Sequence, residues 1–189
     1  EKFNLFLSED IKNNGIKLNA IIDKTRPTTL KNAIISESYR LLKIDVLDNR
    51  SITLNILKDF KKHISQENCD VLIFSDFRHG IFNKETIDDL IKSIPNDTFK
   101  VADSQVASRW GNIAEFKNFN LITPNEREAR FALGDQDSVI RPLATNLYEI
   151  AACEIMILKL GARGILTHRS RNRDDPRTHY SIDSFAEKI

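Results

Sequence analysis

The order of apolar and polar residues predicts alternating helices and strands from residue 51 onward. Residues 53–64 place leucine, isoleucine and phenylalanine on one helical face and lysines on the other, as in an amphipathic helix capped by Ser51 or Thr53. Residues 69–75 form a continuous apolar run, which is typical of a parallel strand buried on both faces. Further strand patterns lie at residues 99–102, 155–158 and 178–182, and further helical patterns at 84–94, 125–133 and 139–153. This alternation predicts an α/β layered fold with a mainly parallel sheet flanked by helices.

The first 50 residues follow a different pattern. Helical spacing of apolar residues predicts a helix over residues 1–14, ended by Gly15, and residues 16–22 are predicted to form a strand. Residues 28–36 and 39–47 predict two further strands. Their apolar positions do not alternate cleanly, which favours a partly exposed sheet over a core strand.

These patterns divide the chain into three parts. Residues 1–22 are expected to be an N-terminal helix and a strand of the core. Residues 23–50 are expected to be a small β flap or lid. Residues 51–189 are expected to be an α/β core.

Composition narrows the classes of protein. The chain has 189 residues, of which 41% are hydrophobic and 29% charged, as in an ordinary globular protein with one good-sized core. A net charge of +1 gives no reason to expect nucleic acid or an anionic membrane as a partner. No apolar run approaches the roughly 20 residues of a membrane span, and no signal peptide is evident. Cys69 and Cys153 lack a CxxC spacing, so we expect buried free thiols and a cytoplasmic protein.

One stretch, residues 120–130, carries candidate chemistry. A short apolar run ends at Thr123-Pro124, and a helical pattern begins at once, with Asn125 at the N-cap position and Glu128 three residues later. Free backbone N–H groups and the helix dipole make such a terminus a good site for phosphate or a metal-bound phosphate. The same spacing also suits a capped helix that binds no ligand, and spacing alone leaves both interpretations open.

A second stretch, residues 154–168, predicts two strands joined by a tight glycine turn. Gly161 and Gly164 permit positive φ and the close approach of a ligand to the backbone. Lys159, at the end of the first strand, has the reach to contact a phosphate. A plain hairpin with a solvated lysine fits these residues equally well.

Four stretches together resemble the ribokinase-like, or PfkB, family of carbohydrate kinases. TPNEREAR (123–130) resembles the family's TPN-x-x-E segment, and LKLGARGILTH (158–168) resembles its LG-x-x-G nucleotide turn. VLIFSDFRHGIF (71–82) and TRPTTLKNAIISESYRLLKID (25–45) are similar to the SDY-x-KG segment and the R-x-TT-x-K flap of the heptose-phosphate kinase branch. The four stretches occur in the family's order, so the resemblance implies a ribokinase-like fold.

The resemblance implies phosphoryl transfer from ATP to a sugar hydroxyl, assisted by Mg²⁺. It places the nucleotide and its phosphates near Lys159, Gly161 and Gly164. Asn125 and Glu128 would complete that site and hold Mg²⁺ through water, which suits a cation that keeps most of its waters.

The same resemblance places Arg26, Thr29, Lys31 and Asp76 at the sugar substrate. From the residues alone, Arg26 and Lys31 fit equally well as solvated flap charges, and Asp76 as a loop-capping carboxylate. His79 stands where the heptose-phosphate kinase branch has lysine. In the family the flap often pairs with a second subunit, which implies a homodimer.

Two segments of the family are missing from this sequence. The glycine-rich N-terminal stretch is absent, and no GAGD segment with its catalytic aspartate occurs. We therefore expect a central piece of a kinase that does not phosphorylate sugar as given. The alternative is a non-catalytic nucleotide-binding or dimerisation module, and the sugar itself stays open.

Overall fold

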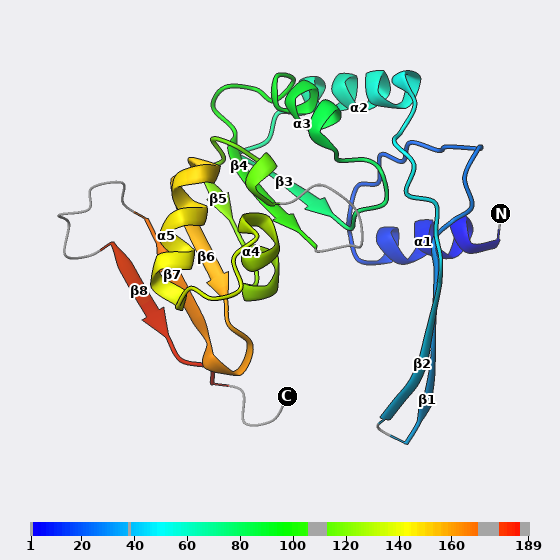
Figure 1. The fold of residues 1–189 in the computed structure, drawn as a ribbon. Coiled ribbons are helices and arrows are strands. Elements are labelled where there is room, and N and C mark those ends of the chain that lie inside the picture. The colour runs from blue at the N-terminus through cyan, green and yellow to red at the C-terminus, as the bar shows by residue number, and fades with distance from the viewer. Residues whose placement is uncertain (1, 38, 106–112, 170–177, 186–189) are drawn as a thin grey trace.

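A six-stranded sheet forms the centre of the molecule (Figure 1). The computed structural model describes residues 2–37, 39–105, 113–169 and 178–185. The strands of the sheet are β3 (Val71–Asp76), β4 (Phe99–Ser104), β5 (Leu121–Ile122), β6 (Ile155–Lys159), β7 (Ile165–His168) and β8 (His179–Ile182). They follow one another in the order of the chain, with β3 to β6 parallel and β7 and β8 antiparallel. The predicted α/β fold with a mainly parallel sheet is confirmed.

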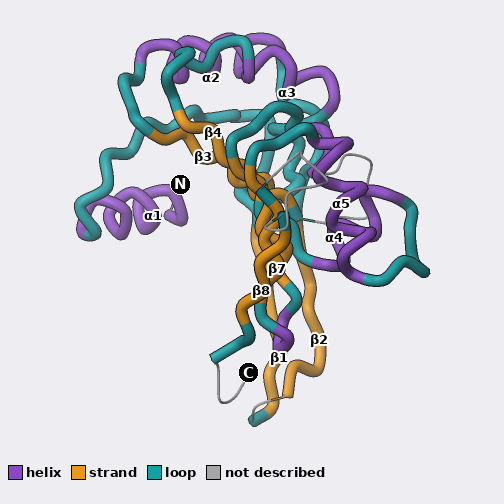
Figure 2. The backbone as a smooth tube through the Cα atoms, turned by 90° about the vertical axis from the view of Figure 1, so that its left-hand side faces the viewer, coloured by secondary structure: helices purple, strands orange, loops and turns teal. Residues whose placement is uncertain are grey.

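Helices follow the strands as the pattern predicts. They are α2 (Leu54–Gln66), α3 (Lys84–Ile91), α4 (Glu126–Leu133) and α5 (Ile140–Ala151), with short 3₁₀ turns η1 (Ile113–Glu115) and η2 (Gly161–Arg163). Figures 1 and 2 show α4 and α5 against one face of the sheet. Leu143 and Leu147 of α5 are fully buried, as are Met156 and Leu158 of β6. The apolar face of α5 thus closes one part of the core.

Four phenylalanines form a second part of the core, beside β3. Phe74, Phe82, Phe116 and Phe119 are buried, and their ring centroids lie 5.0 to 6.2 Å apart. These tilted and edge-on arrangements are the ones that aromatic rings prefer. The cluster fixes β3 and the loops that follow it against the centre of the sheet.

The predicted β flap is a two-stranded antiparallel hairpin. It consists of β1 (Leu30–Ser36) and β2 (Tyr39–Val46), and every described residue of both strands is exposed. Figure 1 shows the hairpin projecting away from the sheet. The prediction of two partly exposed strands is therefore confirmed.

Part of the N-terminal prediction is wrong. The helix is present as α1 (Lys2–Asn13), and Gly15 after it has a φ of 72°. Residues 16–22, however, form no strand. None of the described strands pairs with them, and Ile16 and Ile22 remain exposed. A local apolar pattern becomes a strand only where a partner strand satisfies its backbone.

The prediction that β3 is buried on both faces is also wrong. Phe74 and Asp76 are buried, but Val71 and Ile73 are 50% and 63% exposed. The reason is that β3 lies at the edge of the described sheet with one face uncovered. Both cysteines are free, as predicted, although only Cys153 is fully buried. No helix in the described ranges is long and apolar enough to cross a membrane.

Candidate functional site

The carboxyl ends of the four parallel strands meet at one edge of the sheet. In α/β sheets of this kind, ligands bind outside that edge. The strands end at Asp76, Ser104, Ile122 and Lys159, and the next residues of the chain form loops or helix starts there. The structure therefore brings the predicted nucleotide residues and Asp76 to the same edge.

The start of α4 is a capping box, as the spacing predicts. Asn125 has extended backbone and its Oδ1 accepts from the Glu128 N–H at 2.9 Å, while Glu128 Oε2 accepts from the Asn125 N–H at 2.7 Å. This arrangement fixes both side chains at the first turn of the helix. Glu128 is 7% exposed, so its carboxylate is held against the start of the helix.

Lys159 contacts both the segment before α4 and the end of β4. Its backbone N–H donates to the Pro124 carbonyl at 2.8 Å, and its Nζ lies 2.8 Å from Asp103 Oδ1 at the end of β4. The same Asp103 oxygen accepts from Thr123 Oγ1 at 2.8 Å. Asp103 was not among the predicted site residues. A carboxylate at the carboxyl end of a strand is the signal that points to it.

The glycine turn after Lys159 uses its two glycines differently. Gly161 and Gly164 have φ of 61° and 83°, a region that residues with a Cβ rarely adopt. A Cβ at Gly161 would meet no atom within 4 Å, whereas a Cβ at Gly164 would overlap the Ile182 carbonyl oxygen. The close approach predicted for a ligand is therefore made, at Gly164, by the chain's own β8.

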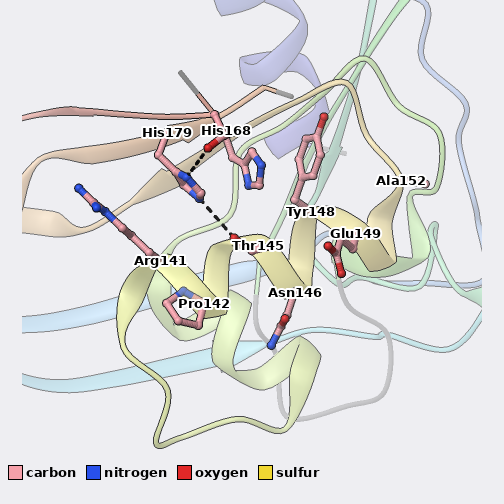
Figure 3. A pocket seen from close by; sticks show the side chains of 10 residues that line it. Arg141, Pro142, Thr145, Asn146, Tyr148, Glu149, Ala152, His168 and His179 are labelled. Carbon is pink, nitrogen blue, oxygen red and sulfur yellow. Dashed lines mark hydrogen bonds between the residues drawn. The ribbon is translucent and has the colours of Figure 1, made fainter. Parts of the chain in front are cut away.

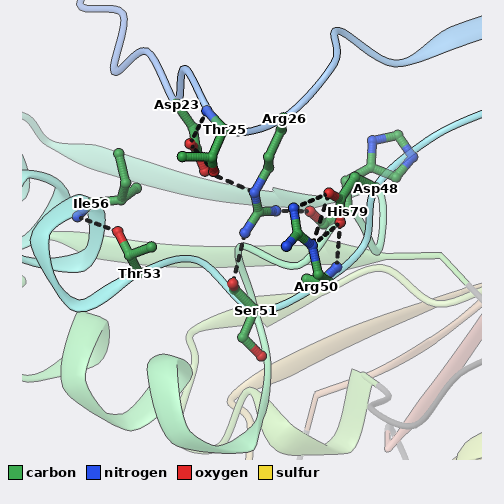
Figure 4. A network of polar contacts seen from close by, with 9 residues as sticks. All are labelled: Asp23, Thr25, Arg26, Asp48, Arg50, Ser51, Thr53, Ile56 and His79. Carbon is green, nitrogen blue, oxygen red and sulfur yellow. Dashed lines mark hydrogen bonds and ion pairs between the residues drawn. The ribbon is translucent and has the colours of Figure 1, made fainter.

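Arg26 ties the base of the flap to the core (Figure 4). Its Nε pairs with Asp23 Oδ2 at 2.8 Å. Its Nη2 donates to the Ser51 carbonyl at 2.7 Å, and its Nη1 to the His79 carbonyl at 3.1 Å. The guanidinium is largely buried and its donors contact the chain itself, so it holds the flap against the loop that follows β3.

The other predicted flap residues contact the same loop, residues 77–80. Thr29 Oγ1 lies 3.3 Å from His79 Nδ1, and Lys31 Nζ lies 5.5 Å from the centre of the Phe77 ring. Burial and then the charge of Lys31 lower the pKa of His79 below its ordinary value. The structure thus brings Arg26, Thr29 and Lys31 together at the carboxyl end of β3.

Asp76, at the end of β3, is a buried carboxylate that fixes the start of this loop. It is 2% exposed, and its oxygens accept from the Arg78 N–H at 2.7 Å, from Arg78 Nη1 at 2.6 Å and from Ser104 Oγ at 3.0 Å. Arg78 was not predicted as a partner of Asp76. Its φ of 60° turns the chain so that its side chain returns to the carboxylate.

The fold of this chain matches solved structures of other proteins. No family model matches the chain. Ribokinase from Thermotoga maritima superposes with a TM-score of 0.69 at 17% identity, covering 100% of this chain and 58% of that one. Phosphofructokinase-2 from Escherichia coli in complex with fructose-6-phosphate gives 0.60 at 14%, covering 82% and 50%. This chain has the ribokinase-like fold.

Sequence similarity agrees with that fold. The bifunctional protein HldE of Desulfatibacillum aliphaticivorans is 28% identical over 153 residues, which cover 77% of this chain and 30% of that protein. The chain therefore spans about a third of the length of this curated relative. The resemblance to ribokinase-like kinases is confirmed by both comparisons.

A separate pocket of about 640 Å³ lies away from this edge of the ribokinase-like sheet (Figure 3). It is bounded by α5 and by the ends of β7 and β8. Tyr148 stacks on His168 at 4.1 Å between ring centroids, and His168 lies 4.3 Å from His179. His168 pairs with Met156, near the start of β6, so the pocket lies toward the amino end of that strand. None of the predicted site residues lines it.

Proposed function

We propose that the chain is the central part of an ATP-dependent carbohydrate kinase, which transfers the γ-phosphoryl group to a hydroxyl of a sugar or sugar phosphate. One observation carries this proposal. The capped start of α4, Lys159 and the glycine turn converge at the carboxyl edge of a ribokinase-like sheet. The likeness to ribokinase, to phosphofructokinase-2 and to bifunctional HldE supports it.

Each residue at this edge has a role in the proposal. Backbone N–H groups in the first turn of α4 and around Gly161 would hold phosphate oxygens, and Lys159 would neutralise part of their charge. Asn125 and Glu128 offer hard oxygen donors, which fit a Mg²⁺ ion held through its waters. When bound, that ion would supply charge neutralisation of the phosphates during transfer.

The flap side would bind the acceptor sugar. Thr29 and Lys31 contact the loop after β3, next to the carboxyl edge of the sheet. Arg26 would act at the same place by fixing the base of the flap. Asp76 would support that loop through its contact with Arg78. The flap sequence favours a heptose phosphate as the acceptor, by resemblance to that branch of the family.

Catalysis requires more than these residues. The sequence contains no GAGD segment, whose aspartate is the base by resemblance to the family. We therefore propose that the 189-residue chain binds nucleotide without transferring phosphate by itself. The flap suggests a second role, because its exposed apolar residues on both strands would pair with the flap of a second copy.

Calorimetry with Mg²⁺ and ATP tests the nucleotide site. Gly161→Ala would place a methyl group in the open turn and is expected to weaken binding several-fold. Gly15→Ala is a matched control, because Gly15 has a similar φ of 72° and equally open surroundings far from the site. Glu128→Gln is expected to weaken binding as well. A folded parent chain that binds no ATP would contradict the proposal.

A further inference from the structure

Two cations at the glycine turn, Lys159 before it and Arg163 within it, are paired with carboxylates of other elements. Lys159 Nζ lies 2.8 Å from Asp103 Oδ1 at the end of β4. Arg163, in the turn itself, pairs with Glu126 Oε2 in the first turn of α4. Glu126 also accepts from Arg130 Nη2 at 2.8 Å through its other oxygen. The turn is thus linked by ion pairs to the two elements that border the nucleotide site.

These pairs restrain side chains rather than the backbone. The backbone of Lys159 is fixed independently by its hydrogen bond to Pro124. Asp103 is positioned by a hydrogen bond from Thr123, two residues before the N-cap of α4. The side chains of Lys159 and Asp103 are 42% and 40% exposed, so an entering ligand can reach both.

Asp103 and Glu126 also affect how an anionic ligand would bind. Lys159 is already paired with Asp103, and Arg163 shares Glu126 with Arg130. A phosphate without a metal ion must compete with these carboxylates and then lie beside them, which like charges disfavour. A phosphate that carries a divalent cation brings compensation for both carboxylates.

We propose that Asp103 and Glu126 make nucleotide binding depend on a divalent cation. They hold Lys159 and Arg163 when no nucleotide is bound, and they release these side chains to a nucleoside triphosphate that arrives with its metal ion. Both are positioning residues that act through the cations of the turn. This inference rests on the nucleotide site proposed above.

The test compares ATP binding by calorimetry in EDTA and in excess MgCl₂. Asp103→Asn is expected to raise the affinity for metal-free ATP about two- to fivefold, the range expected for a partly exposed ion pair. The gain in affinity on adding Mg²⁺ should shrink accordingly. Glu126→Gln should shift binding in the same direction.

Asp89→Asn is a matched control. Asp89 pairs with Lys61 at 3.3 Å with side chains 43% and 39% exposed, on α3 and α2. This variant removes the same charge at similar exposure and should leave both affinities unchanged. Circular dichroism would show that every variant keeps the fold.

Three outcomes are distinguishable. A smaller Mg²⁺ effect in Asp103→Asn, with tighter metal-free binding, supports the inference. Unchanged or proportionally weakened binding with and without Mg²⁺ overturns it, because a loss of structure alone would reduce both affinities together. A parent chain that binds no ATP in either condition overturns the nucleotide site itself.

Discussion

Single glycines in this chain serve different physical purposes, although the sequence presents them as one motif. Gly161 has open space where a side chain would stand, which suits the approach of a ligand. Gly164 lies against the Ile182 carbonyl, so β8 requires a residue without Cβ there. The spacing of the two glycines predicted the turn correctly. It gave no means of separating a glycine with open surroundings from one that packs against β8.

His179 gives a prediction about pH. Burial lowers the pKa of His179 below 6.5, and the nearby His168 and Arg141 lower it further. The unfolded chain therefore binds more protons than the folded one as the pH falls below about 6.5, so this contribution to stability is present above that pH and is lost below it. We expect chemical denaturation to show a lower free energy of unfolding at pH 5.5 than at pH 7.5.

His179→Gln should reduce this pH dependence. The neighbouring Thr145 hydroxyl, 3.3 Å from His179 Nε2, can still bond to an amide. His63→Gln, on the exposed side of α2, is the control and should leave the profile unchanged. An identical profile in His179→Gln and the parent would show that His179 does not set the dependence.

Two helices in the described part of the chain begin with capping boxes, which makes a matched experiment possible. Asn125 caps α4 among the predicted nucleotide residues, and Asn83 caps α3 beside Ser51, with Oδ1 accepting from the Thr86 N–H at 2.9 Å and Nδ2 donating to Ser51 Oγ at 3.1 Å. Alanine at either position is expected to cost about 1 kcal/mol of stability. Only Asn125→Ala is expected to weaken binding of ATP with Mg²⁺, because α4, unlike α3, begins among the residues proposed to bind nucleotide.

Thermal unfolding and calorimetry on both variants check this prediction. Equal losses of stability with unequal losses of affinity would separate the role of Asn125 in binding from its role in the helix. Equal affinities in the two variants would mean that the start of α4 serves only as a capped helix, the alternative that spacing alone allowed.

The strands of the flap are exposed along their whole described length, and this exposure predicts self-association. Ile35 and Leu41 are 62% and 61% exposed on opposite strands of a hairpin that no other described element covers (Figure 1). Two-stranded ribbons with apolar faces are marginal alone and gain stability by burying those faces. We expect sedimentation velocity to show concentration-dependent dimers. The double variant Ile35→Lys, Leu41→Lys should shift the chain toward monomer.

Leu54→Lys serves as the control for added charge, because Leu54 is 82% exposed on α2. It should leave the association constant as in the parent. A monomeric parent, or dimers that persist in the flap variant, would contradict a flap interface.

The fold could be predicted where short-range patterns control it. The amphipathic helices, the flap hairpin and the strand-to-helix turn at Pro124 all depend on neighbours within a few residues. The strand predicted at residues 16–22 and the buried faces of β3 failed for a common reason. Both depend on what lies alongside, and a local apolar pattern carries no information about the presence of a partner strand or a covering helix.

By itself, the sequence determined the elements and the local chemistry of the site: Asn125 and Glu128 at a helix start, and two glycines in a turn after Lys159. Only the tertiary structure decided the long-range pairs. Lys159 meets Asp103 across 56 residues, and Arg26 meets the His79 carbonyl across 53. The assembled sheet creates the first contact by bringing the ends of β4 and β6 together, and the packing of the flap base on the loop after β3 creates the second. Residues far apart in the sequence become partners only when the tertiary structure brings their elements together, as it does the ends of β4 and β6 on either side of β5.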